Sequence, residues 1–326
     1  MRALVIADQQ VRVEERPDPQ PSPGEVVVRV HGAGLNRADL VQRAGFYHAP
    51  PGSPADIPGL EFAGEVVAHG DGVTDPELGA RVFGIAGGGG QAELLAVPAS
   101  QCAVVPDSID LVTAGGVPEV FVTAHDALVT QCAMQAGEVL LVQAVGSGVG
   151  TAAVQLGRAT GCTVVGTART AAKLEQARAL GLDHGVLAAR ELDPVALAAD
   201  ITDAVGNVDV VLELVGGDYL VTDLAVAGLR GRIALVGMMG GTRTQVDLGA
   251  MLMKRLRVYG TTLRGRSVDE KAAATAAFAR DVVPLLASGA IVPVIARTLP
   301  LDEAPAAYEL LASDAVFGGI VLDLTR

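Results

Sequence analysis

The chain has 326 residues, half of them hydrophobic, and a formal net charge of −13. This length allows two domains with separate cores, and no apolar run reaches the roughly 18 to 20 residues that a membrane-spanning helix needs. The acidic balance argues against nucleic acid or an anionic membrane as a partner. Because residues 1–8 read as a strand and not as a signal peptide, we expect a cytoplasmic protein.

Short β-strands dominate the chain up to about residue 115. The clearest is the Val-rich segment at 25–30, and turn-forming residues separate several others. A polar segment among them predicts a short helix that starts near Asn36, followed by a loop at Pro50-Pro51-Gly52 that is suited to line a site. This pattern is typical of a compact, barrel-like β domain.

Strands and helices alternate from about residue 118 onward. The alternation indicates a parallel sheet covered by helices, and its six strands fit a doubly wound nucleotide-binding domain. We expect a long helix at 268–287 and a C-terminal end that completes the first domain. The prediction is therefore an α/β protein with domains at 1–117 plus 288–326 and at 118–287. The predicted strands lie at 139–144, 163–167, 184–187, 208–213, 231–236 and 257–261, and the predicted helices at 149–160, 171–180, 193–202 and 217–228.

A glycine-rich turn joins the first of these strands to its helix. The turn reads Gly146-Ser147-Gly148-Val149-Gly150. Gly148 and Gly150, with Ala153, match the G-x-G-x-x-A form of the dinucleotide fingerprint. The glycines allow a tight turn and the close approach of a pyrophosphate, which the N-terminus of the following helix can bind. The sequence therefore predicts a dinucleotide cofactor at residues 146–150.

The strand at 163–167 indicates which dinucleotide is bound. NAD-binding proteins usually carry an acidic residue about 20 positions after the glycines to bind the adenosine ribose. The segment at 163–170 carries no acid, and the first one arrives only at Glu175. Arg169 and Lys173 lie one helical turn apart, where they can hold a 2′-phosphate. NADPH is therefore predicted. The alternative is that both are solvated charges, although a cation in the first turn opposes the helix dipole.

Several short motifs occur together along the chain. They are Asn36-Arg37-Ala38-Asp39-Leu40, Gln42-Arg43-Ala44-Gly45-Phe46-Tyr47, Gly59-Leu60-Glu61, Ser147-Gly148-Val149-Gly150, Gly237-Met238-Met239-Gly240-Gly241 and Leu263-Arg264-Gly265-Arg266. With them, the chain resembles the medium-chain dehydrogenase/reductase superfamily, and within it the zinc-free quinone oxidoreductases related to zeta-crystallin. These motifs are similar to those of the p53-inducible quinone oxidoreductase subgroup. The resemblance implies a GroES-like barrel domain and a six-stranded Rossmann domain.

The resemblance also implies that no metal is bound. Where zinc-dependent members have a zinc-binding cysteine and histidine, this chain has Asn36 and Leu60, and Zn²⁺ needs several sulfur or nitrogen ligands. Cys102, Cys132 and Cys162 form no C-x-x-C pair and are expected to be buried thiols.

An NADPH:quinone oxidoreductase is the activity that the resemblance implies, with metal-free hydride transfer to a quinone in a cleft between the domains. Tyr47 and Asn36 are expected to position or hydrogen-bond the acceptor. The expected cofactor contacts are Thr123, Gly146, Ser147, Gly148, Val149, Gly150, Thr167, Arg169, Lys173, Gly237, Met238, Met239 and Leu263.

Some of these residues have a purely structural alternative. Tyr47 can anchor its loop without taking part in chemistry. Asn36 can be a helix N-cap that Asp39 completes. Glu61 is expected to be a buried, hydrogen-bonded structural acid, and the methionines at 238 and 239 can be packing residues.

Two other functions compete with quinone reduction. An NADPH-dependent reductase of alkenals, enones or enoyl thioesters acts on an activated alkene and must protonate carbon, so it needs a placed proton donor. A non-enzymatic NADPH-binding protein would bind the cofactor without turnover. The resemblance further implies a homodimer, for which the alternating segment at 257–262, near Val258, is a suitable edge strand.

Overall fold

The computed structural model describes all 326 residues, and they form two compact units. Unit 1 consists of Met1–Val122 and Leu263–Arg326, and unit 2 of Thr123–Thr262. No helix in either unit is long and apolar enough to cross a membrane.

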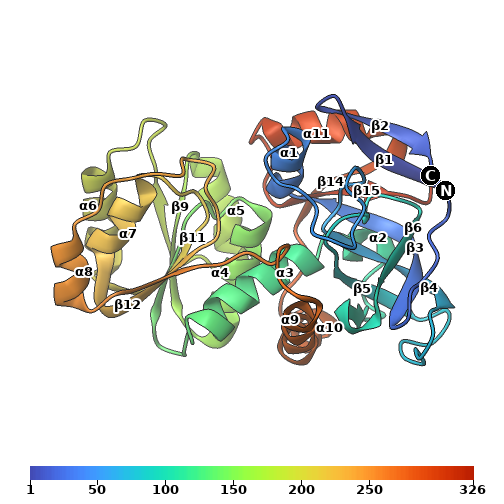
Figure 1. The fold of residues 1–326 in the computed structure, drawn as a ribbon. Helices are drawn as coiled ribbons and strands as arrows, with labels where there is room; N and C mark the ends of the chain where they lie inside the picture. Colours follow the sequence, from blue (N-terminus) through green and yellow to red (C-terminus); the bar gives the residue numbers. More distant parts are fainter. The chain divides into compact units, whose positions relative to one another are not determined.

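Unit 1 is built on a seven-stranded sheet in the order β14-β15-β3-β4-β5-β7, in which β6 also pairs with β3, and on a separate β1-β2 hairpin (Figure 1). The strand β15 pairs antiparallel with β3, with Val321 opposite Gly34. The C-terminal end therefore completes the first unit, as predicted. The strands are β1 Arg2–Ala7, β2 Gln10–Glu15, β3 Glu25–Leu35, β4 Glu61–His69, β5 Arg81–Ile85, β6 Leu94–Pro98, β7 Cys102–Val104, β14 Ile295–Pro300 and β15 Gly319–Asp323.

The helices of unit 1 cover this sheet and connect its strands. Tyr308, on the helix α11, is fully buried in the apolar core, and its hydroxyl donates a hydrogen bond to Gln91 Oε1 (2.8 Å). The helices are α1 Arg37–Arg43, η1 Ala99–Gln101, α2 Leu111–Ala114, α3 Pro118–His125 (which continues into unit 2), α9 Val268–Asp281, α10 Val283–Ala287, η3 Leu301–Glu303 and α11 Ala304–Ala312.

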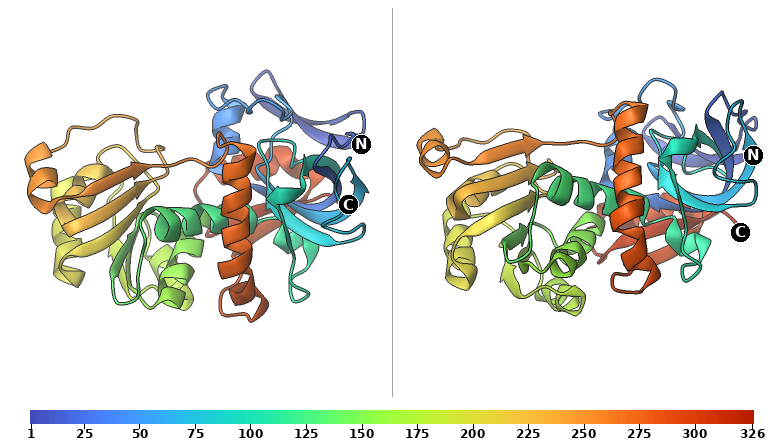
Figure 2. Two further views of the ribbon diagram at one scale, coloured as in Figure 1. Left: turned by 60° about the horizontal axis from the view of Figure 1, so that its bottom comes forward. Right: turned by 90° about the horizontal axis from the view of Figure 1, so that it is seen from below.

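The boundary between the units differs from the predicted one, because residues 263–287 belong to unit 1. The helix α9 packs against β5 and β7, and the rings of Phe83 and Phe278 lie with their centroids 5.3 Å apart. Figure 2 shows α9, in orange, beside the strands of unit 1. Burial of Phe278 against the barrel, which a local sequence pattern does not reveal, decides where this helix belongs.

The predicted helix at 268–287 is in fact two helices. The helix α9 ends at Asp281, and α10 begins at Val283 with Pro284 in its first turn. Because proline lacks a backbone N–H and clashes with the preceding turn, a continuous helix through this position is disfavoured.

Unit 2 is a doubly wound α/β domain with a six-stranded sheet in the order β10-β9-β8-β11-β12-β13. All of its strand pairs are parallel, as predicted. Figure 1 shows α4 and α5 on one face of the sheet and α6 and α7 on the other. The elements are η2 Asp126–Gln131, β8 Val139–Val142, α4 Gly148–Thr160, β9 Thr163–Ala168, α5 Ala171–Leu180, β10 His184–Leu187, α6 Pro194–Val205, β11 Val208–Glu213, α7 Tyr219–Val226, β12 Ala227–Leu235, α8 Leu248–Lys254 and β13 Arg257–Gly260.

Candidate functional site

The glycine turn joins β8 to α4 in unit 2. Ser147 is the N-cap of α4: its Oγ accepts a hydrogen bond from Gly150 N (3.0 Å) and donates to the carbonyl oxygen of Ala144 (2.9 Å). A Cβ atom at Gly150 would lie only 2.4 Å from that same carbonyl oxygen, so the turn requires glycine here. With Gly148 and Val149 in its first turn, the N-terminus of α4 suits a phosphate group.

A buried polar network holds this turn from inside the domain. Thr167 Oγ1 donates to Gln143 Oε1 (2.5 Å) and accepts from Ala144 N (3.3 Å). Gln143 Nε2 donates in turn to Asp223 Oδ1 (2.7 Å). Thr167, 1% exposed, therefore uses its hydroxyl to fix the turn. Gln143 and Asp223 could not be singled out from the sequence, because only the folded sheet brings residues 80 positions apart together.

Asp223 also shares a proton with Glu213 at the end of β11. Glu213 Oε1 accepts hydrogen bonds from the backbone N–H groups of the second and third residues after it, whereas Glu213 Oε2 and Asp223 Oδ2 are buried and no N–H group reaches them. The two carboxyl groups are hydrogen-bonded to each other, which requires a proton between them. Burial raises the pKa of both, and the neighbouring Glu213 raises the pKa of Asp223 further, so Asp223 carries the proton. Tyr219 also faces this pair, and the charge of Arg169 acts on Tyr219.

We expect Asp223→Asn to flatten the pH dependence of stability. The unfolded chain releases this proton above about pH 4 and the native pair keeps it, so the wild-type free energy of unfolding falls by about 1.4 kcal/mol per pH unit up to the native pKa. An amide can donate to Glu213 without a bound proton, while Tyr219 and Arg169 stay in place. Urea unfolding of the domain at several pH values measures the slope. Asp200→Asn, at an exposed position on α6, is the control, and an unchanged slope in Asp223→Asn would contradict the shared proton.

The two predicted cations follow β9. Arg169 is exposed directly after the strand, and its charge acts on Tyr219. Lys173 lies in the first turn of α5, where its aliphatic part covers Gly146: a Cβ atom at that glycine would lie 2.7 Å from Lys173 Cδ. The structure therefore brings Lys173 to the glycine turn.

The loop after β12 contains three more of the predicted cofactor residues. A Cβ atom at Gly237 would lie 2.0 Å from the carbonyl oxygen of Leu214, so glycine allows two loops to approach each other. Met238 and Met239 are 57% and 56% exposed, which contradicts their interpretation as packing residues. Because β8, β11 and β12 are parallel neighbours, the loops that follow them lie at one edge of the sheet.

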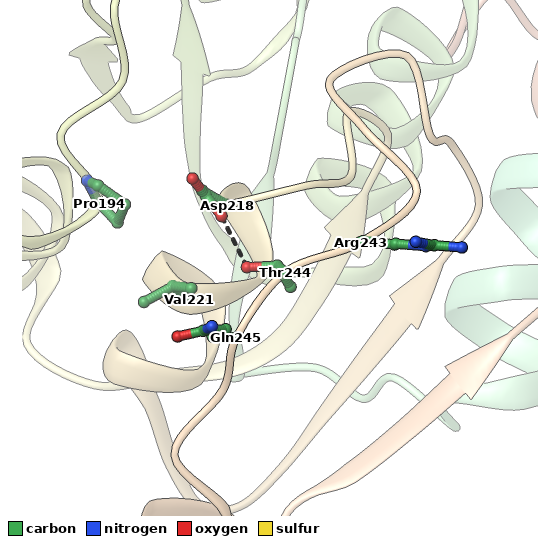
Figure 3. A pocket seen from close by; sticks show the side chains of 6 residues that line it. All are labelled: Pro194, Asp218, Val221, Arg243, Thr244 and Gln245. Atoms are coloured by element: carbon green, nitrogen blue, oxygen red, sulfur yellow. Dashed lines mark hydrogen bonds between the residues drawn. The ribbon is translucent and has the colours of Figure 1, made fainter.

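A shallow hollow of about 560 Å³ also lies in unit 2 (Figure 3). On its wall, Thr244 Oγ1 donates a hydrogen bond to Asp218 Oδ1 (2.7 Å). None of its residues belongs to the glycine turn or to the predicted cation pair, so we assign it no part in cofactor binding. The lining residues are Pro194, Asp218, Val221, Arg243, Thr244 and Gln245.

Asn36, in unit 1, is the N-cap of α1, and its backbone N donates to Asp39 Oδ2 (2.8 Å). Its side-chain amide donates instead to Glu61 Oε1 (2.8 Å), and the second oxygen of Glu61 accepts from the backbone N of Glu119 (2.9 Å). Gly34 makes room for this contact, since a Cβ atom there would lie 2.0 Å from Glu61 Oε1. Glu61 is thus a buried, hydrogen-bonded acid, and burial raises its pKa to about 8.

Tyr47 lies in the loop after α1, where Arg264 holds it. Arg264 is 3% exposed and donates to the carbonyl oxygens of Tyr47 (2.8 Å) and Gly87 (2.8 Å) and to Gln42 Oε1 (2.7 Å). Its guanidinium carbon lies 4.8 Å from the centre of the Tyr47 ring, a cation–π contact. The Leu263-Arg264-Gly265-Arg266 motif is the only sequence signal for this role.

The two remaining predicted residues are both buried. Thr123 is 8% exposed on α3, and Leu263 is 6% exposed at the start of the second segment of unit 1.

Comparison with known proteins covers both units. Residues 148–279 match a family model described as zinc-binding dehydrogenase, and residues 22–107 match the alcohol dehydrogenase GroES-like domain. The chain is 29% identical to quinone oxidoreductase of Sus scrofa over 308 residues, which are 93% of this chain and 90% of that protein.

Solved structures are also similar to this chain over nearly its whole length. An alcohol dehydrogenase superfamily protein from Novosphingobium aromaticivorans is 30% identical, with a TM-score of 0.86 over 99% of each chain. Quinone oxidoreductase of Escherichia coli in complex with NADPH is 28% identical, with a TM-score of 0.86 over 99% of this chain and 100% of that one.

Proposed function

The chain belongs to the medium-chain dehydrogenase/reductase superfamily, and from this premise we propose that it is an NADPH-dependent quinone oxidoreductase. Its GroES-like β domain and its parallel Rossmann sheet are those of the superfamily. Similarity to quinone oxidoreductases extends over nearly the whole chain. The finer placement, in the subgroup similar to p53-inducible quinone oxidoreductase, is supported by the motifs around Asn36 and Tyr47.

The observation that carries the proposal is the glycine turn with Lys173 packed on Gly146. The N-terminus of α4 would hold the pyrophosphate of NADPH, and Lys173 with Arg169 would hold its 2′-phosphate. When bound, the reduced nicotinamide supplies a hydride.

The residues of unit 1 would orient the acceptor. Glu61 fixes the Asn36 amide, and Arg264 fixes the loop and ring of Tyr47, so both groups are preorganised for hydrogen bonding. Asn36 and Leu60 contribute neither sulfur nor ring nitrogen at the positions expected for zinc ligands. A quinone suits such a site, because it accepts hydride readily and then needs only a hydrogen bond and a proton.

Steady-state oxidation of NADPH and NADH tests this proposal against four acceptors: 1,4-benzoquinone, an ortho-quinone, a 2-alkenal and an enoyl thioester. Quinone turnover with NADPH as the preferred cofactor is the expected result. Turnover of the alkenal or thioester alone would identify a double-bond reductase instead. Binding of NADPH without oxidation by any acceptor would identify a cofactor-binding protein.

We also propose a homodimer that forms through β13. This strand pairs with β12 on one side and is the outermost strand of its sheet, and its Val258 is exposed. An unpaired, β-prone edge favours antiparallel pairing with a second copy. The helix α8 just before it exposes Leu248, Leu252 and Met253, which a partner would cover.

Val258→Lys is expected to convert the dimer into a monomer, because a charge on an edge strand opposes strand pairing. Light scattering should give twice 33.1 kDa for the wild type and 33.1 kDa for the variant. Leu187→Lys, on the exposed surface of the opposite edge strand β10, is the matched control and should remain dimeric. A monomeric wild type, or a dimer that only Leu187→Lys disrupts, would refute the assignment.

A further inference from the structure

Three carboxyl groups lie close together in unit 1, and they differ in their hydrogen bonds. Asp39 accepts from Asn36 N (2.8 Å), from Gly59 N (3.3 Å) and from the side chain of Gln91 (3.3 Å). Glu61 accepts one hydrogen bond on each oxygen. These donors stabilise the ionised forms of both groups.

Glu119 is the exception among the three. Its backbone N is fixed by Glu61 (2.9 Å), but its carboxyl group accepts no hydrogen bond from the protein. Its side chain is half-buried and therefore keeps access to a bound molecule. Burial also raises the pKa of Glu61, to about 8, but both oxygens of Glu61 are already hydrogen-bonded. Glu119 is the carboxyl group of the three that no donor stabilises in its ionised form. In agreement, burial and then the charges of Glu61 and Asp39 raise the pKa of Glu119 to about 8.

The other charged groups that face Glu119 are Arg264, Lys271 and Tyr47. Arg264 already donates to three oxygens of the protein. Lys271, on α9, is 6% exposed. Burial lowers the pKa of Lys271, and the negative charge of Glu119 raises it again. Lys271 is therefore placed to compensate the negative charge that forms when Glu119 loses its proton. The charge of Glu119 also raises the pKa of Tyr47, the predicted acceptor-binding residue.

We propose that the Glu119 carboxyl group delivers the proton that the quinone takes up with the hydride. The role rests on the proposed function. When bound, reduced nicotinamide would supply a hydride, with its two electrons, to the quinone. The Glu119 O–H bond breaks as its proton binds the oxyanion of the reduced quinone. Glu119 is left as a carboxylate whose charge Lys271 partly compensates, and it regains a proton from water. Cofactor, quinone and one proton thus give oxidised cofactor and hydroquinone.

The test compares the wild type with Glu119→Gln and Glu119→Asp across the pH range with 1,4-benzoquinone. A proton donor acts in its protonated form, so the wild-type kcat/KM should fall as pH rises through about 8. Glu119→Gln should be roughly 100-fold or more slower at neutral pH and should lose this fall. Glu119→Asp keeps an acid and should keep the fall. Glu77→Gln, at an exposed position of unit 1, should behave as the wild type.

Infrared spectroscopy gives a readout that does not depend on turnover. Below pH 8, the difference spectrum of wild type minus Glu119→Gln should show a protonated carboxyl C=O band, because the other protonated carboxyl groups, such as Asp223, absorb equally in both proteins. The difference between wild type and Glu77→Gln should lack this band. If the band is unchanged in Glu119→Gln, or if that variant keeps both the rate and the fall with pH, the proposal is wrong while the proposed function stands. If the wild type fails to oxidise NADPH with any quinone as the acceptor, the proposed function is wrong. Proton delivery by Glu119 is then wrong as well, even if the infrared band shows that Glu119 is protonated.

Discussion

Replacing Arg169 and Lys173 together by glutamine is expected to weaken NADPH binding by more than about 100-fold and to leave NADH binding nearly unchanged. A hydrogen bond to a charged group contributes about 1.5–3 kcal/mol, or roughly 10-fold to 100-fold for each side chain. Only NADPH carries the 2′-phosphate that these side chains would bind. Lys173 is already held over the glycine turn by its contact with Gly146, so little ordering is needed on binding.

The measurement is the dissociation constant of each cofactor, followed by fluorescence or calorimetry. Arg178→Gln removes a cation from the same helix, α5, where Arg178 pairs with Glu175, and should affect neither cofactor. Equal weakening of NADPH and NADH in the double variant would show that the two cations bind the pyrophosphate or only support the turn. That result would remove the basis for NADPH preference.

The second large effect is expected at Arg264. Arg264→Lys keeps the charge, but a single ammonium cannot reproduce the planar fork that reaches Tyr47, Gly87 and Gln42. Buried acceptors are then left without donors, and we expect a loss of about 3 kcal/mol in stability. Because the Tyr47 loop loses its anchor, kcat/KM for a quinone should also fall, by roughly 10-fold or more.

Thermal or urea unfolding and quinone kinetics check this prediction. Arg297→Lys, at an exposed position on β14 of the same unit, is the matched control and should change neither quantity. Tyr47→Phe adds a second comparison, since it keeps the ring under the guanidinium and removes only the hydroxyl. If Arg264→Lys is as stable and as active as the control, the arginine does not position the loop.

Local patterns in the sequence were sufficient to predict the strands and the glycine turn of the nucleotide-binding unit. The apolar strand, the three glycines and the Ser147 cap are neighbours in the chain, and each has a local conformational reason. Parallel strands covered on both faces must be continuously apolar, and this pattern predicts the inner strand β8, whereas the alternation of residues 257–260 predicts the edge strand β13. The cap at Asn36 followed in the same way, from the Asp39 three residues later.

Contacts between distant residues could not be predicted in this way. Residues 263–287 were assigned to the wrong unit, because the packing of Phe278 on Phe83 joins segments that are far apart in the chain. The buried polar groups also depend on distant contacts: Gln143 meets Asp223, on the helix α7, only in the folded domain.

The sequence by itself determined the superfamily fold and the glycine turn, and it singled out Asn36, Tyr47, Arg169 and Lys173 as candidate site residues. Only the tertiary structure decided the protonation of the buried groups. Whether a carboxyl group keeps its proton depends on burial and on the donors that reach it. Those donors come from other strands and helices, as Glu61 shows with donors from Asn36 and from the backbone of Glu119.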